Sequence, residues 1–156
     1  MKYASACAVF VAGIIAQWFW STYLPLSDIS PQILLILTMA VSSEAGPVAG
    51  QCYGFAWGLA LDAMSVHVFG ANALLLTLAG YFVGVLRRQM DVTGPASQVM
   101  LAALITPAYY LLFGFLGMLF EHQFLWVGWK LFLVNPFYNC LVAMISFPVV
   151  RKHVTL

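Results

Sequence analysis

One acidic side chain, Asp62, lies inside a long apolar segment, where an ionisable group needs a chemical reason. Within a membrane, such a group marks a proton relay, an ion path or a polar contact between helices. A relay usually uses several ionisable groups in series, and this segment holds one. We therefore predict that Asp62 ties neighbouring helices together near the outer surface, with a transport or relay role as the alternative.

A buried carboxylate without a partner costs several kcal/mol, so Asp62 must be protonated, paired or hydrogen-bonded. The sequence offers Lys130, His67 and Asn72 as partners. The amides at the start of the next helix are a further choice, because a helix N-terminus attracts negative charge. Asp62 and Lys130 are both expected near the outer ends of their helices, which makes them a candidate buried polar pair.

Catalytic and metal-binding patterns are weak in this chain. Ser42 and Ser43 place hydroxyl groups beside Glu44, but no histidine accompanies them. The cysteines form neither a CxxC motif nor a cluster with histidine. We predict that the protein is not an enzyme and that it has no metal site and no cofactor.

Glycine recurs at every fourth position before the acid, at Gly46, Gly50, Gly54 and Gly58, and Asp62 continues the same row. On an α-helix this spacing produces one flat face. Such a helix is poor in water, because each glycine costs about 0.5–1 kcal/mol relative to alanine. In a bilayer the same face lets two helices approach closely. It either packs against a neighbour within the protein or receives a helix of another protein.

Alanine forms a second row of small side chains near the N-terminus, with Ala8 and Ala12 at its centre and Ala4 and Ala16 at its ends. The same two interpretations apply to it. Two such faces on one small protein favour the binding of a partner.

The composition identifies the setting of these residues. The chain has 156 residues, of which 63% are hydrophobic and 7% are charged, whereas a soluble domain carries about 25% charged residues. We predict one all-α integral membrane domain over residues 1–156, embedded in the lipid bilayer. A formal net charge of +1 argues against a nucleic-acid partner. At about 20 residues per span, six helices fit, over residues 3–23, 31–41, 47–65, 70–88, 97–120 and 125–150.

Basic residues set the orientation of these six helices. With the N-terminus in the cytoplasm, five of the basic residues fall on the cytoplasmic side and Lys130 falls outside. We therefore predict that both termini are cytoplasmic. The five cytoplasmic residues are Lys2, Arg87, Arg88, Arg151 and Lys152.

The central third of the chain resembles a known family. A proline-led apolar helix begins at Pro31, a GxxxGLxxD motif runs from Gly54 to Asp62, and a GxxxL motif begins at Gly70 and is followed by Tyr81. In order, spacing and chain length this pattern resembles the family of the rod shape-determining protein MreD. The resemblance covers residues 31–88, and Gly54, Gly58 and Asp62 match the central motif.

The resemblance implies a bacterial inner-membrane protein that catalyses no reaction. Family members work with MreC, a bitopic protein whose transmembrane helix is the expected contact. They also work with the other parts of the elongation machinery, the peptidoglycan synthases and the actin-like filament. A homodimer within that complex is left open. The implied fold is similar to that of the substrate-binding subunits of energy-coupling-factor transporters.

Two functions are therefore weighed. The first is a scaffold of the cell-elongation (rod) machinery that binds MreC and helps to regulate cell shape and peptidoglycan synthesis. The second is a substrate-binding subunit of a vitamin or small-molecule transporter, and it draws only on a shared fold. Its ligand would lie among Trp18, Trp57, Asn72, Lys130 and Asn135.

Overall fold

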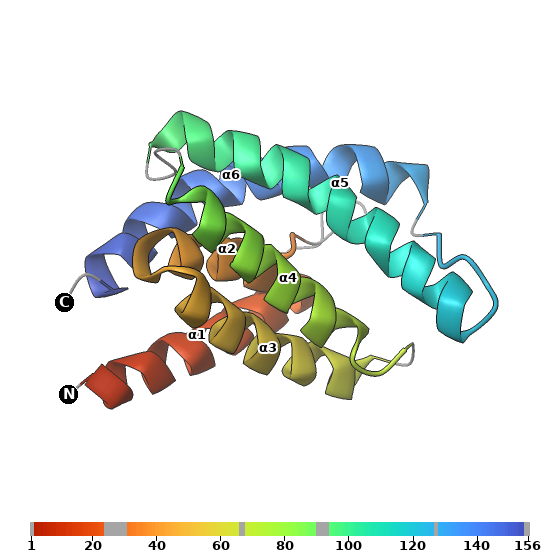
Figure 1. The fold of residues 1–156 in the computed structure, drawn as a ribbon, viewed down its shortest axis with the longest axis horizontal. Helices are drawn as coiled ribbons and strands as arrows, with labels where there is room; N and C mark the ends of the chain where they lie inside the picture. Colours follow the sequence, from red (N-terminus) through yellow and green to blue (C-terminus); the bar gives the residue numbers. More distant parts are fainter. Residues whose placement is uncertain (1, 24–30, 66–67, 90–93, 127, 155–156) are drawn as a thin grey trace.

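The computed structural model describes residues 2–23, 31–65, 68–89, 94–126 and 128–154. Within these ranges the chain forms six α-helices and no strand (Figure 1). This confirms the all-helical prediction. The helices are α1 (Lys2–Tyr23), α2 (Ile33–Ala45), α3 (Pro47–Met64), α4 (Ala71–Leu86), α5 (Pro95–Phe120) and α6 (Trp129–Val154).

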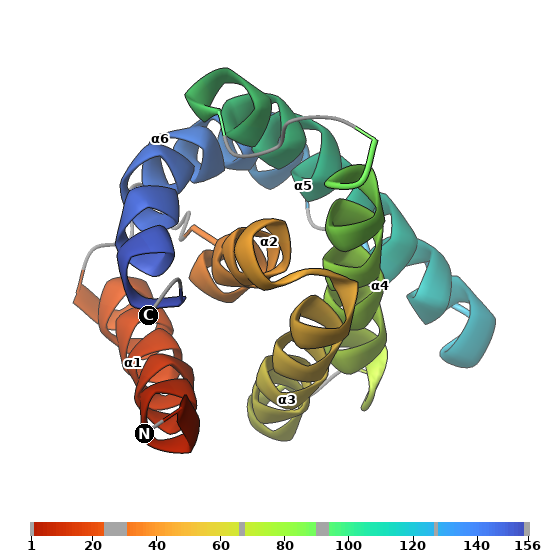
Figure 2. The ribbon, with the colours of Figure 1, turned by 60° about the vertical axis from the view of Figure 1, so that its left-hand side comes forward.

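Helix α2 lies at the centre of the molecule, with the other helices arranged around it (Figure 2). It packs against α1, α3, α4 and α6. Ten of its 13 residues are buried, including the polar Thr38, Ser42 and Ser43. Thr38 and Ser43 donate their hydroxyl hydrogens to backbone carbonyls of α2 itself, at 2.7 and 2.8 Å, which makes their burial tolerable. The core of the protein is therefore built around its shortest helix.

A sharp turn separates α2 from α3. Gly46 has φ +92°, which favours glycine because a Cβ would strain the backbone. The Gly46 amide donates to the Ser42 carbonyl at 2.9 Å and so closes the last turn of α2. Pro47 follows at the first position of α3, where its missing N–H leaves no intrahelical bond unmade. The two helices therefore diverge immediately.

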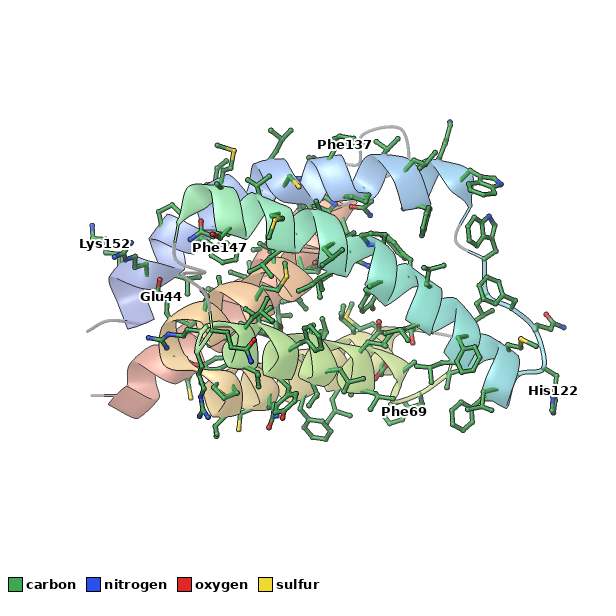
Figure 3. All side chains as sticks on the ribbon, turned by 45° about the horizontal axis from the view of Figure 1, so that its top comes forward. Glu44, Phe69, His122, Phe137, Phe147 and Lys152 are labelled. Carbon is green, nitrogen blue, oxygen red and sulfur yellow. The ribbon has the colours of Figure 1, made fainter. Side chains whose placement is uncertain are left out.

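Large apolar side chains cover the outside of the molecule. Leu119 of α5 and Phe137 and Ile145 of α6 are 60%, 76% and 66% exposed, and Figure 3 shows Phe137 pointing away from the bundle. Exposed apolar surface of this kind marks a lipid-facing protein. Two helices, over Ala96–Phe120 and Trp129–Lys152, are long and apolar enough to cross a membrane. The arrangement of six spans stays a prediction.

The helix ends lie at two opposite ends of the bundle. Helix α1 begins, and α6 ends, at one end of the bundle, where α2 ends and α3 begins (Figure 1). Glu44 and Lys152 lie at this end, and His122 lies at the opposite end (Figure 3). We call the first the basic end, since it also carries Arg87 and Arg151.

Candidate functional site

The glycine face of α3 is covered by α4. A Cβ added at Gly54 would lie 2.5 Å from the Leu76 carbonyl oxygen, and one added at Gly58 would lie 2.5 Å from the Ala73 nitrogen. Real side chains do not approach backbone atoms so closely, so only glycine permits this packing. The pair α3 and α4 forms the most extensive helix contact of the structure.

Helix α4 contributes glycines of its own to this contact. A Cβ at Gly84 would lie 2.8 Å from the Pro47 Cβ, and Gly80 faces the Gly50 carbonyl. The Ser42 hydroxyl of α2 also donates to the Gly80 carbonyl. Two glycines one turn apart on α4 thus complement the row on α3. Gly46 differs from the row, because nothing lies within 4 Å of its Cβ position and it acts in the turn.

Asp62 lies near the end of α3, away from the basic end, and is 1% exposed. Its Oδ1 accepts hydrogen bonds from the Asn72 amide at 3.0 Å and from Asn72 Nδ2 at 2.9 Å. Its Oδ2 accepts one from the Ala73 amide at 2.9 Å. Both amides belong to the first turn of α4, where backbone donors have no intrahelical partner and the helix dipole favours negative charge. The carboxylate therefore caps α4 from another helix.

The polar contacts continue from Asp62 into α5. The Tyr109 hydroxyl donates to Asn72 Oδ1, so a chain of buried side chains links α3, α4 and α5. Tyr109 was not predicted, because nothing in the sequence distinguishes its ring from the lipid-facing aromatic residues.

A second group of buried polar contacts joins α2, α5 and α6. Asn139 Nδ2 donates to Thr106 Oγ1 at 3.0 Å, and Asn139 Oδ1 accepts from the Gln32 amide at 3.0 Å. Asn135 Nδ2 donates to the Tyr110 hydroxyl. These bonds fix α6, which continues through Pro136 and Pro148, against the centre of the protein.

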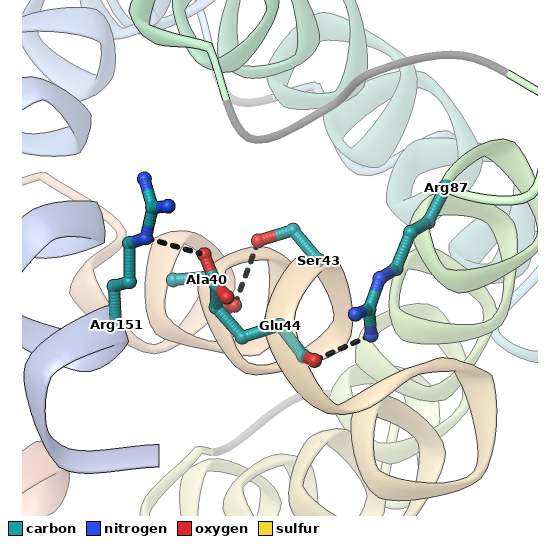
Figure 4. Close-up of polar contacts among 5 residues, drawn as sticks. All are labelled: Ala40, Ser43, Glu44, Arg87 and Arg151. Carbon is teal, nitrogen blue, oxygen red and sulfur yellow. Dashed lines mark hydrogen bonds and ion pairs between the residues drawn. The ribbon is translucent and has the colours of Figure 1, made fainter. Parts of the chain in front are cut away.

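A cluster at the basic end joins α2 to α4 and α6 (Figure 4). The Glu44 carboxylate lies 4.0 Å from Arg151 Nε, and the Arg87 guanidinium donates to the Glu44 carbonyl. Ser43 donates within its own helix, to the Ala40 carbonyl at 2.8 Å. The polar residues of this turn therefore hold helix ends together.

Lys130 takes no part in the Asp62 site. Its side chain is exposed at the start of α6, and the donors that bond the Asp62 carboxylate come from the start of α4. The physical reason is proximity, because α4 follows α3 after a short connection and presents its free amides directly. His67, the other basic candidate, lies outside the described residues.

The alanine row faces an open groove. Ala8, Ala12 and Ala16 line one wall, Val142 and Val149 belong to the opposite wall on α6, and α2 forms the floor. The volume of the groove is about 480 Å³.

Helix α1 is anchored beside this groove at two points. The Trp20 indole N–H donates to the Tyr138 hydroxyl at 2.7 Å and bridges α1 to α6. Gly13 allows α1 to rest on Trp57, whose indole N–H donates to the Phe10 carbonyl at 3.0 Å. These contacts hold α1 against α6 and α3 beside the groove.

The family of the chain follows from a comparison with protein-family models. The model of the rod shape-determining protein MreD matches residues 3–155. The chain belongs to the MreD family. The match extends far beyond residues 31–88, where the sequence motifs were visible, and includes α1, α5 and α6. No curated protein and no solved structure matches the chain.

MreD proteins are membrane proteins of rod shape determination, and theirs is not an enzyme family. The residues considered for a vitamin ligand do not come together. Trp57 is fully buried, Lys130 is exposed, and Asn135 lies in the contact with Tyr110. Trp18 and Asn72 alone line one cavity.

Proposed function

We propose that this MreD protein is a non-enzymatic scaffold of the cell-elongation machinery, and that it receives the transmembrane helix of MreC in the groove between α1 and α6. The groove supports this proposal because it is apolar, is open at the surface, and has small side chains at helical spacing on one wall. Small residues allow a partner backbone to approach closely where lipid gives no hydrophobic driving force.

The choice between the two small-residue faces rests on what already covers them. Gly50, Gly54 and Gly58 face α2 and α4 atoms at contact distance or closer, so a partner could reach them only by separating helices. Ala8 and Ala12 are exposed. The alanine row therefore serves the partner, and the glycine row holds the scaffold together.

The remaining parts of the proposal concern the cell. The protein crosses the bacterial inner membrane six times with both termini in the cytoplasm, so that the basic end faces the actin-like filament and MreC carries the link to the peptidoglycan synthases. Arg87 and Arg151 at the basic end support this orientation under the positive-inside rule. A second copy of the chain is the alternative occupant of the groove.

The test is co-purification from the native host in mild detergent, followed by mass spectrometry of the captured chains. Ala12→Trp fills the groove, and Val11→Trp places the same ring on an exposed position outside the groove. We expect the wild type and Val11→Trp to recover a single-span protein with a coiled-coil periplasmic domain, and Ala12→Trp to recover at least about tenfold less.

Other outcomes would argue against the proposal. Full recovery with Ala12→Trp would exclude the groove as the docking surface. Capture of ATPase subunits with a membrane coupling protein would instead favour the transport function.

A further inference from the structure

A separate cavity of about 390 Å³ opens between α1, the start of α2, the end of α3, the start of α4 and the middle of α5. Leu61 and Met64 of α3 and Leu34 of α2 give it apolar walls, and Trp18 of α1 contributes an aromatic ring. Its volume lies within the range of pockets that enclose small ligands, about 300–1,000 Å³. The cavity uses a different face of α1 from the alanine row.

Polar side chains from several helices also converge on this cavity. Asn72 and Tyr109 reach it from the Asp62 network, and Ser65 reaches it from the end of α3. The hydroxyl hydrogens of Tyr109 and Ser65 are already donated, to Asn72 Oδ1 and to the Asp62 carbonyl. Their oxygens can still accept a hydrogen bond. The wall therefore offers acceptors at fixed positions.

Gln32 provides the observation that points to a ligand. Its backbone amide is used by Asn139, but its Oε1 is buried and has no hydrogen-bond partner. A buried acceptor that is left unsatisfied is unfavourable. Gln32 lines the cavity, and its flexible side chain can turn the amide toward a bound molecule. A hydroxyl group satisfies either end of an amide, because it both donates and accepts.

The charge of the cavity restricts the ligand further. None of the described residues that line it is charged. Among the described residues, the acid bonded to this lining is Asp62, which is buried and has both oxygens occupied by donors of α4. An ion entering this cavity would lose water without gaining a counter-charge. The site therefore favours a neutral molecule.

We propose that this cavity binds a small neutral molecule that carries hydroxyl groups on an apolar body. The apolar part packs against Leu61, Met64 and Trp18, and a hydroxyl bonds the Gln32 amide. Such a molecule reaches the site either from water, as a small glycoside, or from the bilayer, as a neutral glycerolipid. The inference goes beyond the proposed function and does not rest on it, since the groove for MreC is a different surface.

The experiment uses the full chain in nanodiscs and native mass spectrometry. Phenyl β-D-glucopyranoside is titrated from water in one arm, and monoolein is added to the nanodisc lipid in the other. Gln32→Leu removes the unsatisfied amide, and Ala60→Phe fills the cavity from α3. Gln123→Leu is the matched control, because Gln123 is exposed in the turn after α5.

We expect saturable binding of at least one probe to the wild type and to Gln123→Leu, weakened at least about tenfold in Gln32→Leu and Ala60→Phe. The Gln32→Leu protein should melt no lower than the wild type, which separates lost binding from lost folding. Binding of the glucoside identifies a water-borne ligand, and binding of monoolein alone identifies a lipid. Absence of saturable binding by both probes, or unchanged binding in Gln32→Leu and Ala60→Phe, would overturn the proposal.

Discussion

Replacing Gly58 by alanine tests whether the glycine row holds α3 against α4. The added Cβ would lie 2.5 Å from the Ala73 nitrogen, whereas non-bonded atoms settle at about 3.5–4.0 Å. The two helices must therefore separate by about 1 Å or more. The Ala73 amide is also a donor to Asp62 Oδ2, at 2.9 Å, so the same displacement stretches the cap of α4.

The expected cost follows from these contacts. Overpacking costs about 1–3 kcal/mol, and loss of one hydrogen bond to a charged group costs about 1.5–3 kcal/mol. The higher helix propensity of alanine offsets about 0.5–1 kcal/mol of this cost. We therefore expect Gly58→Ala to lower the free energy of unfolding by about 2–5 kcal/mol.

The assay is reversible unfolding of the purified protein in mixed micelles, followed by circular dichroism and tryptophan fluorescence. Gly94→Ala is the control, because its Cβ position has only the Ser97 Oγ nearby, at 3.8 Å. That variant should stay within about 0.5 kcal/mol of the wild type. A Gly58→Ala protein as stable as the control would refute internal packing by the glycine face of α3. If this variant instead lost only its complex with a partner, the glycine face would be a partner-binding surface.

Three further substitutions test the contacts around this helix pair. Asp62→Asn keeps the fold because its amide oxygen still accepts from α4, although its NH2 group then faces one of the donors that bond Asp62. Asp62→Leu leaves all of these buried donors unsatisfied and should cost at least about 2 kcal/mol more in the same assay. Equal stability of both variants and the wild type would contradict the cap. Trp57→Ala removes a fully buried ring and its hydrogen bond to the Phe10 carbonyl. We expect this substitution to lower the free energy of unfolding by about 3–5 kcal/mol and to detach α1, which would be measured as faster proteolysis within α1. Unchanged proteolysis would show that α1 is held by other contacts.

The sequence predicted the number and order of helices in the described ranges because apolar segments and turn residues mark them strongly. It placed the start of the last helix a few residues early, since Gly128 has φ +90° and the chain turns there. The second helix is too short to span a bilayer, both in the predicted segment over residues 31–41 and in the observed α2 of 13 residues. The position of α2 at the centre of the molecule explains its short length. No local pattern in the sequence indicates that position.

The candidate site was predictable only in part. Four-residue spacing indicates a close helix contact but does not name the neighbour. Gly80 and Gly84, one turn apart in the next helix, are the sequence feature that indicates this neighbour. Asn72 was considered beside Lys130 as a partner of Asp62, and only the position of the first turn of α4 decides between them. Tyr109 could not be found, because its contact joins residues 37 positions apart.

The central position of α2 has a consequence for how the chain is made. At about 1.5 Å per residue this helix is about 20 Å long, shorter than the hydrocarbon core of a bilayer. During synthesis it leaves the ribosome before α3, α4 and α6, which supply most of its packing surface. Its buried hydroxyls meet partners such as the Gly80 carbonyl only after those helices arrive. The packing of α2 is therefore complete only when α6, the last helix described, has been made.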